Sequence, residues 1–272
     1  MAVAAQPREG KFVVDGCSLR YVEWPRAGRT LLIIPGSGGL GGSPWSWRGL
    51  AEAMNDVRRV VVLVMRGHAG SCWSEPYDFS RFIADISAYV RSVGEEVDVL
   101  GHSSGAWWAW GYAEDPDGRT GHLILVDPVL PWEGRDERPQ TLRERSWRTQ
   151  EELIDELRVR WRVVPSADAD LVAGVRDGTH RLPNGMWTWR LDPVLQEGIR
   201  PGTHRPGLEL IERSREIRAR TLVLLRDEHP QHERFRELFG RDAVVVVPKA
   251  HHVMQLSSPD ELARLTREFL LA

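Results

Sequence analysis

Short runs of branched apolar residues recur along the chain, and segments with helical spacing separate them. The runs TLLIIPG at 30–36, RRVVVLVMRG at 58–67, VDVLGHS at 97–103 and HLILVDP at 122–128 do not alternate with polar residues. Strands of that kind are buried on both faces, as in a parallel sheet covered by helices. The segments between them, such as FSRFIADISAYVRSV, repeat apolar residues at helical intervals. The pattern therefore predicts an α/β fold with a mostly parallel sheet covered by helices.

An opening hairpin and a long interruption complete this organisation. The runs KFVVDG and LRYVEW flank an Asp-Gly pair, which is typical turn chemistry between two antiparallel strands. The strand–helix order later breaks off and resumes with RTLVLLR, ERFRELFG and DAVVVVP. The interruption carries amphipathic helical stretches and no convincing central strand, and its roughly ninety residues exceed an ordinary connection. We predict a core of residues 1–127 and 219–272 with a helical cap inserted at 128–218.

Composition excludes several classes of partner and compartment. The 272 residues are 42% apolar, and the net charge of −3 gives no reason to expect a nucleic acid or a membrane surface. Cys17 and Cys72 show no metal-ligand spacing and cannot form a disulfide framework, so two unpaired thiols in a reducing compartment are expected. The start MAVAAQPREGKF does not resemble a signal peptide. We expect a cytoplasmic monomer or homodimer that acts on a small molecule.

One motif carries the chemistry. Gly101-His102-Ser103-Ser104-Gly105 follows the strand VDVL and precedes a helical segment, which is the context that gives G-x-S-x-G its meaning. The glycines permit a sharp turn that lifts the Ser103 hydroxyl off the sheet and points helix N–H groups at the same space. A nucleophilic serine requires this arrangement.

A base for that serine is expected near the C-terminus. The sequence VVVVPKAHHVMQLSSPDELARL predicts a strand, a loop with two histidines and a helix. Here the chain resembles the α/β-hydrolase superfamily, whose last loop reads like G-H-x-x-x-L-x-x-P. Matching Leu256 and Pro259 to that pattern implies that His252, rather than His251, is the catalytic base. MRGHAGS also resembles a family segment, although Val64 replaces its usual aspartate.

The glycine-rich loop after the run TLLII has two interpretations. Gly36, Gly38 and Gly41 fit the spacing G-x-G-x-x-G, but the proline after the strand and the missing acidic residue disfavour a dinucleotide site. The resemblance implies instead an oxyanion loop, in which Pro35-Gly36 replaces the usual His-Gly. Ser37 then supplies one N–H donor, and Ser104 supplies the second.

The acid of the triad has two candidates. The resemblance places it after the penultimate strand, but in LLRDEHP the matching position is His229, with Asp227 nearby. Some branches of the superfamily, including thioesterases of peptide and polyketide assembly, carry the acid one strand earlier, which implies Asp127. We favour Asp127 and keep Asp227 as the alternative.

Twelve tryptophans suggest an apolar substrate. Trp45 beside the oxyanion loop and Trp132 at the start of the cap, together with Gly36, are the candidate substrate-binding residues. The resemblance implies a serine hydrolase that cleaves an ester, thioester or lactone through an acyl-enzyme, without a metal or an organic cofactor. The alternatives are a C–C bond hydrolase, a lyase or cofactor-independent oxygenase, and a ligand-binding receptor with low turnover.

Overall fold

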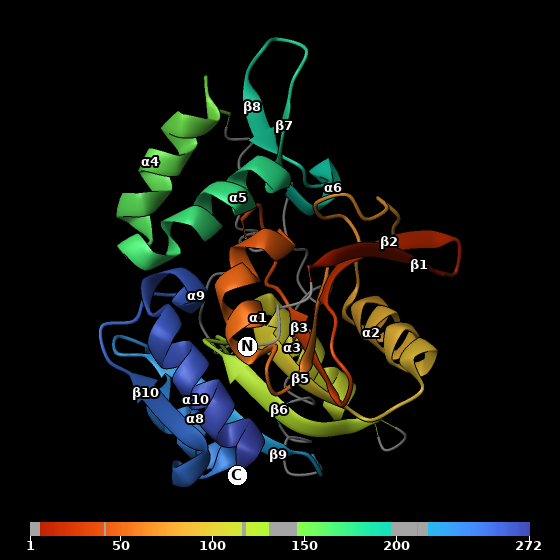
Figure 1. The fold of residues 1–272 in the computed structure, drawn as a ribbon, viewed down its shortest axis with the longest axis vertical. Coiled ribbons are helices and arrows are strands. Elements are labelled where there is room, and N and C mark those ends of the chain that lie inside the picture. Colours follow the sequence, from red (N-terminus) through yellow and green to blue (C-terminus); the bar gives the residue numbers. More distant parts are fainter. Residues whose placement is uncertain (1–5, 41, 116–117, 131–145, 197–210, 212–216) are drawn as a thin grey trace.

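The computed structural model describes residues 6–40, 42–115, 118–130, 146–196, 211 and 217–272. Its described part contains an eight-stranded sheet in the order β1-β2-β4-β3-β5-β6-β9-β10 (Figure 1). Every neighbouring pair from β4 to β10 is parallel, whereas β1–β2 and β2–β4 are antiparallel. The predicted α/β fold with a mostly parallel sheet is confirmed. The strands are β1 (Arg8–Val14), β2 (Cys17–Trp24), β3 (Thr30–Ile34), β4 (Arg59–Leu63), β5 (Val97–His102), β6 (Thr120–Val126), β9 (Arg220–Arg226) and β10 (Val244–Val247).

The opening hairpin forms for the reason that its sequence indicates. β1 and β2 pair from Arg8↔Glu23 to Val14↔Cys17. The two turn residues, Asp15 and Gly16, both have positive φ, at 48° and 77°. A two-residue turn with two positive φ angles matches the right-handed twist of the strands, and Asp-Gly is a favoured pair for it.

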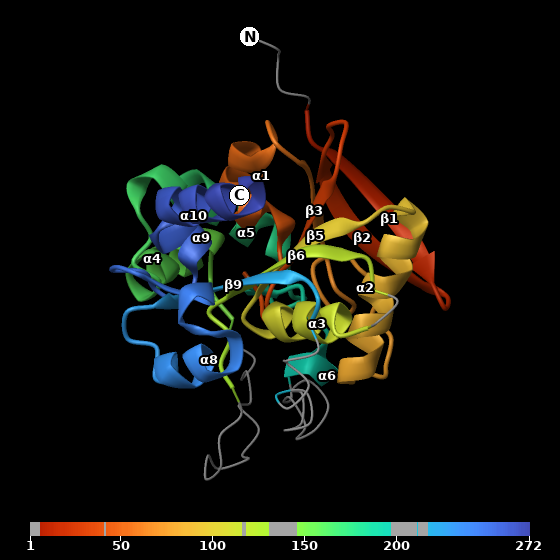
Figure 2. The ribbon, with the colours of Figure 1, turned by 90° about the horizontal axis from the view of Figure 1, so that it is seen from below.

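Helices cover both faces of the sheet (Figure 2). Along β3, Leu31 and Ile33 belong to the apolar cluster formed with α1 and α10, whereas Leu32 and Ile34 belong to the cluster with α2, α3 and α8. Successive side chains of a strand point to opposite faces, so two covered faces require an uninterrupted apolar run. The helices are α1 (Arg48–Met54), α2 (Phe79–Val93), α3 (Ser104–Ala113), α8 (His232–Phe239) and α10 (Pro259–Leu271).

The tryptophans that follow Ser103 are core residues. Trp108 and Trp110 are completely buried, and Trp107 is 3% exposed. Trp108 stacks on Phe82 of α2 at a ring-centroid distance of 4.1 Å, and Trp107 stacks on Trp110 at 5.2 Å. These rings fix α3 against the sheet and thereby fix the turn that precedes it.

The described part of the segment predicted to be a cap, which is called the cap below, gathers at one end of the molecule (Figure 1). It has an apolar centre of its own, to which Leu153, Leu157 and Leu171 contribute. Val253 and Leu256, from the loop and helix after β10, and Leu40 after β3 join this cluster. The cap therefore packs on two loops of the core. Its elements are α4 (Gln150–Arg160), α5 (Asp168–Gly178), β7 (Thr179–Arg181), β8 (Trp187–Trp189) and α6 (Pro193–Gln196), and the helix after β10 is α9 (Met254–Ser257).

The β7–β8 hairpin in the cap was not expected from the sequence. Each strand has only three residues, which is too short for an alternating pattern to be distinguished from helical spacing. Leu182 N–H donates to the Met186 carbonyl and closes the hairpin. The turn between them requires a positive φ at Gly185, which is 84°. A backbone bridge between Trp147 and Trp187 ties it to the segment before α4.

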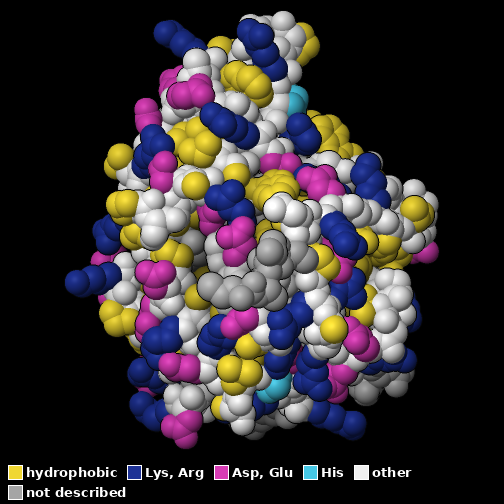
Figure 3. All heavy atoms as spheres, viewed as in Figure 1, with side chains coloured by type: hydrophobic (Ala, Val, Ile, Leu, Met, Phe, Trp, Pro, Cys, Tyr) yellow, Lys and Arg dark blue, Asp and Glu magenta, His cyan; other side chains and the backbone are white. Residues whose placement is uncertain are grey.

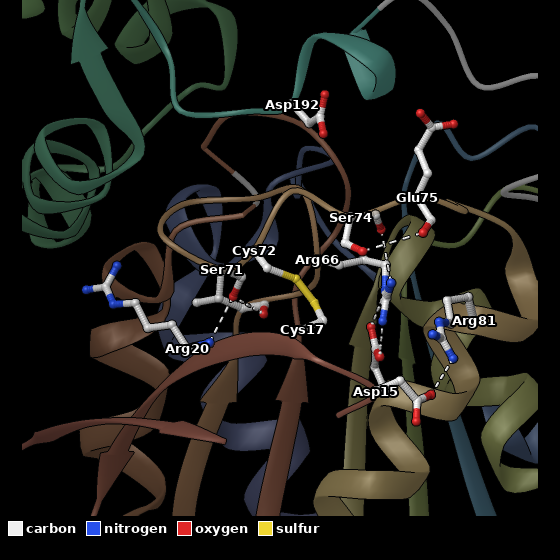
Figure 4. The surroundings of a disulfide bond; sticks show 12 residues. Asp15, Cys17, Arg20, Arg66, Ser71, Cys72, Ser74, Glu75, Arg81 and Asp192 are labelled. Carbon is white, nitrogen blue, oxygen red and sulfur yellow. Dashed lines mark hydrogen bonds and ion pairs between the residues drawn. A yellow bond between two sulfur atoms is a disulfide. The ribbon is translucent and has the colours of Figure 1, made fainter. Parts of the chain in front are cut away.

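Cys17 and Cys72 form a disulfide, so the prediction of two unpaired thiols is wrong (Figure 4). They are separated by 55 positions in sequence, and their Cα atoms lie 5.6 Å apart. The loop after β4 folds back over the start of β2, where Cys72 N–H donates to the Ser18 carbonyl. Only the strand order brings these residues together, and the pairing removes the thiols as an argument for a reducing compartment.

Removing this disulfide is expected to lower the free energy of unfolding. Opening a loop of this length enlarges the entropy of the unfolded chain, which corresponds to about 2–4 kcal/mol. The double variant Cys17→Ala/Cys72→Ala should therefore have a lower urea midpoint than the wild type. Reductant should lower the wild-type midpoint toward that of the variant and leave the variant unchanged. An equal midpoint for both proteins, with and without reductant, would contradict the expectation.

The surface carries both signs of charge. On the face shown in Figure 3, positive and negative side chains are interleaved, in agreement with the small net charge. Among the described residues, no helix has both the length and the apolar character needed to cross a membrane.

Candidate active site

Ser103 occupies a sharp turn between β5 and α3. Its φ of 54° and ψ of −119° are strained for a residue with a Cβ atom, so the surrounding packing must impose them. The flanking glycines permit that packing. A Cβ at Gly101 would lie 2.4 Å from the Gly105 carbonyl oxygen, and a Cβ at Gly105 would lie 2.2 Å from the Ile34 carbonyl oxygen. The motif therefore serves a close approach between the turn, the start of α3 and the end of β3.

Two further side chains reach Ser103 in a chain of hydrogen bonds. His252, on the loop between β10 and α9, has Nε2 3.1 Å from Ser103 Oγ and Nδ1 2.6 Å from Asp127 Oδ2. Asp127 directly follows β6, the strand beside β5. A carboxylate can only accept, so Nδ1–H donates to it, and the lone pair of Nε2 faces the Ser103 hydroxyl. This is the arrangement that general-base activation of a hydroxyl requires.

Asp127 is held ionised by its surroundings. Its side chain is fully buried, its φ is 46°, Arg226 N–H donates to Oδ1 at 3.2 Å, and the Arg226 guanidinium pairs with Oδ2. Burial by itself would raise the pKa of Asp127. The hydrogen bond and charge of His252, followed by the charge of Arg226, outweigh burial and hold that pKa below its ordinary value. The carboxylate is therefore available to orient the imidazole at neutral pH.

The structure does not bring Asp227 or His251 into this chain. Asp227 is exposed, and its Oδ2 accepts a hydrogen bond from Lys249 N–H at 2.6 Å. The backbone N–H of His251 donates to Ser257 Oγ, and its ring meets Trp161 edge-on. Of the two candidate acids, only Asp127 contacts His252, and of the two histidines, only His252 contacts Ser103.

The glycine-rich loop after β3 lies against the serine turn. A Cβ at Gly36 would be 3.0 Å from Ser103 Cβ, so this loop passes directly over the candidate nucleophile. The hydroxyls of Ser37 and Ser104 form a hydrogen bond of 2.7 Å that joins the loop to the first residue of α3. The first N–H groups of a helix have no intrahelical partner, so Ser104 N–H is a free donor by position. The two predicted oxyanion residues are thus neighbours.

Side chains from two other segments hold this loop. His68 Nδ1 lies 2.9 Å from the Arg66 carbonyl, which can only accept, so Nε2 carries the lone pair that accepts Gly38 N–H at 3.4 Å. Trp189 of β8 covers Gly39 so closely that a Cβ there would lie 1.7 Å from its ring. The loop after β4 and the cap therefore both determine the shape of the glycine-rich loop.

Of the two tryptophans expected at the substrate site, only Trp45 lies in the described part of the chain. Trp45 is half-buried and packs edge-on against the core residue Trp24, with ring centroids 6.1 Å apart, and no described contact joins its ring to Ser103, His252 or Asp127. Trp132 lies outside the described residues. Trp161, at the end of α4, is 6.2 Å from the His252 ring and stacks with the Arg160 guanidinium at 5.0 Å. Trp161 is therefore a cap residue whose ring lies beside the candidate base His252.

A metal site is not evident in the described part of the chain. There, no group of three or more histidine, cysteine, aspartate or glutamate side chains is arranged to hold an ion. The prediction that the reaction needs no metal or organic cofactor remains a prediction.

The sequence model of the Alpha/beta hydrolase family matches residues 31–265, which is most of the chain. The chain belongs to this family. The fold agrees, since solved alpha/beta hydrolases superpose over nearly the whole structure. E-2-(acetamidomethylene)succinate hydrolase superposes with a TM-score of 0.79 at 17% identity, over 98% of this chain and 100% of that chain. A thioesterase domain from the curacin biosynthetic pathway gives a TM-score of 0.78 at 19% identity, over 96% and 99%. Identities this low establish the fold alone.

A curated relative is similar over part of its sequence. The N-formylmaleamate deformylase of Pseudomonas putida strain KT2440 is 28% identical over 136 residues, which cover 49% of this chain and 50% of the relative. The match thus spans half the length of that relative. Its named activity is a property of that protein.

Two residues of the candidate site in this protein, Arg226 and Trp161, were not predicted from the sequence. Arg226, which pairs with Asp127, is the last residue of a predicted strand, and arginines are too frequent in this chain to single it out. Trp161 lies in a stretch that reads only as an amphipathic helix. Arg226 ends β9, which lies beside β6, so the strand order would have placed it near Asp127 at the carboxyl end of the sheet.

Proposed function

We propose that the protein is a serine hydrolase that cleaves an ester or thioester through an acyl-enzyme. The observation that carries the proposal is the chain of hydrogen bonds from Ser103 through His252 to Asp127, at 3.1 Å and 2.6 Å. A hydroxyl beside the lone pair of an imidazole, with that imidazole oriented by a buried carboxylate, is the recurring arrangement for acyl transfer.

The reaction would begin when His252 Nε2 takes the Ser103 proton as Ser103 Oγ attacks the substrate carbonyl. Asp127 keeps Nδ1 protonated and stabilises the imidazolium that forms. The N–H groups of Ser37 and Ser104 would donate to the tetrahedral oxyanion, and the bond between their hydroxyls keeps the two donors at a fixed separation. His252 then protonates the leaving group, and water, activated by the same base, hydrolyses the acyl-enzyme.

The leaving group would lie beside the cap. His252 Nε2 delivers the proton to it, and the Trp161 ring is 6.2 Å from the imidazole. An aromatic side chain at that place provides apolar surface at low entropic cost. This supports the expectation of an apolar or aromatic substrate, with Trp161 in the role predicted for Trp45.

A second candidate is hydrolysis of an N-formyl or other amide bond. The similarity to a deformylase over half of its length favours this candidate. The same nucleophile, base and oxyanion donors serve both reactions. The difference lies in the leaving group, because an amine must be protonated by His252 before it departs, whereas an alkoxide or thiolate is a better leaving group.

Labelling with a fluorophosphonate tests the proposal. One adduct per chain, on Ser103 by peptide mapping, is the expected result. Ser74→Ala, which removes a hydroxyl whose described bond is only a 3.5 Å contact to the Glu75 carbonyl, is the matched control and should label like the wild type. Failure to label under conditions that modify a known serine hydrolase would refute the proposal.

Substrate panels then separate the candidates. Aryl esters, acyl thioesters, N-formyl amides and aromatic diketones should be compared at equal concentration with the labelled protein as the blank. The proposal expects the highest kcat/KM for an ester or thioester. A higher kcat/KM for the N-formyl amides would favour the second candidate, and cleavage of the diketones alone would indicate a C–C bond hydrolase.

A further inference from the structure

His102 precedes the candidate nucleophile and has no part in the chemistry described above. It is the last residue of β5, and its side chain is 3% exposed. Its Nε2 lies 2.7 Å from the backbone carbonyl oxygen of His252, 150 positions further along the chain. The residue beside the nucleophile thus contacts the residue that carries the base.

The direction of this hydrogen bond is fixed by its partner. A backbone carbonyl can only accept, so Nε2–H of His102 is the donor. In the described part of the chain, the buried Nδ1 has no hydrogen-bond partner, and it faces Gly36, where a Cβ would come within 3.3 Å. A proton on Nδ1 would be buried without an acceptor, which is costly. The ring therefore carries its single proton on Nε2.

We propose that His102 is a positioning residue that fixes the backbone of His252 relative to Ser103 through this hydrogen bond. The inference rests on the proposed function of Ser103 and His252. Asp127 and His102 divide the task between them. Asp127 accepts a hydrogen bond from Nδ1 and fixes the rotation of the His252 imidazole. His102 donates to the backbone carbonyl of the same residue and fixes the position of the main chain from which the imidazole extends.

The packing around the ring supports this role. Trp47, completely buried, meets the His102 ring edge-on at 5.5 Å, and the ring centroids of His102 and His252 are 5.0 Å apart. Burial and the nearby His252 lower the pKa of His102 to about 3. The ring consequently stays neutral at neutral pH. A neutral donor in a fixed place adds no competing charge to the base.

No other described side chain provides the same restraint. The neighbouring bond, His251 N–H to Ser257 Oγ, connects the loop to α9 and lies within the same short segment. The bond from His102 is the one that connects the His252 carbonyl to β5, the strand that ends directly before Ser103. Loss of this restraint would leave the loop folded but would let the base shift relative to its nucleophile.

Three substitutions at His102 distinguish positioning from packing. His102→Gln keeps an N–H donor at the same number of bonds from Cα. His102→Phe and His102→Leu fill the site with an apolar side chain and remove the donor. If the bond positions His252, kcat for the best ester and the rate of fluorophosphonate labelling should fall by roughly 10- to 100-fold in Phe and Leu, with KM unchanged. Gln should retain most of both rates.

Packing alone predicts the opposite order, because a buried amide disturbs an apolar site more than a phenylalanine does. The melting temperature of each variant is measured beside its rates, and Leu replaces Phe in the comparison if Phe does not fold. Trp47→Phe is the matched control: it keeps an aromatic ring beside His102 and leaves the hydrogen bond to the His252 carbonyl in place, so kcat should be preserved.

Two outcomes overturn the inference. Wild-type rates in the Phe or Leu variant would show that the bond does not position the base. Equal losses in Gln and in the apolar variants would show that only the shape of the imidazole matters. A wild-type protein that fluorophosphonate does not label would refute the proposed function itself, and that failure is visible before any His102 variant is made.

Discussion

Replacing Ser103 with alanine should lower kcat by roughly 10⁶-fold on any substrate that the wild type hydrolyses through an acyl-enzyme. The variant loses the only hydroxyl that the described structure places against His252 Nε2, at 3.1 Å. The fold should be retained, because an alanine has fewer contacts to satisfy at a strained turn. Steady-state and single-turnover rates with an aryl ester, measured beside the melting temperature, test this expectation.

A residual rate well above the uncatalysed one is expected for Ser103→Ala. The donors of Ser37 and Ser104 remain in place, and such donors retain part of the catalysis when the nucleophile is absent. A variant that kept more than about one tenth of the wild-type kcat would contradict the acyl-enzyme mechanism. It would favour chemistry in which His252 activates water directly or acts on a substrate proton.

Replacing Asp127 with asparagine should lower kcat by roughly 10⁴-fold. An asparagine amide can donate to His252 Nδ1, which would leave Nε2 protonated toward Ser103 and unable to accept its proton. The substitution also removes the carboxylate that pairs with the Arg226 guanidinium. The comparison requires kcat with the same ester, at a pH where the wild-type rate no longer changes.

Asp227→Asn is the matched control for this prediction. Asp227 is exposed and accepts from Lys249 N–H, so its substitution should alter the loop after β9 and leave kcat near the wild-type value. If Asp227→Asn instead caused the larger loss, the acid would follow β9, and the arrangement seen around Asp127 would be structural only.

The turn that carries Ser103 could be predicted because its geometry depends on adjacent residues. A strand, two glycines in fixed positions and a helix are all encoded within the stretch 97–113. The strained φ of Ser103 and the close approach of Gly101 to Gly105 follow from that short stretch and the packing on it. The same is true of the Asp-Gly turn between β1 and β2, whose geometry is set by two residues.

Contacts between segments that are distant in the sequence could not be predicted from adjacent residues. Cys17 and Cys72 gave no signal in their spacing, and they meet only because the loop after β4 returns over β2. Trp45 follows the glycine-rich loop in sequence, yet the turn into α1 directs its ring to Trp24. Sequence proximity to a catalytic loop does not determine which way a side chain points.

The choice between Asp127 and Asp227 also depended on contacts between segments that are distant in the sequence. Both follow strands at the carboxyl end of a parallel sheet, and the resemblance to the α/β-hydrolase superfamily made both of them candidates. A hydrogen bond needs a separation of about 3 Å, whereas knowing the strand order locates a side chain only to within several ångströms. Only the packed backbone around the His252 loop shows which carboxylate reaches Nδ1.

The resemblance to the α/β-hydrolase superfamily pointed to His252 as the candidate base. By itself, the sequence determined the α/β class, the succession of strands and helices along the chain up to residue 127 and the turn at Ser103. These follow from apolar periodicity and from the conformational freedom of glycine, which act over a few neighbouring residues. The disulfide, the acid, the bond from His102 to the His252 carbonyl and the position of Trp161 were decided by the tertiary structure. Each depends on distances between segments that the chain joins only through the packing of the whole sheet.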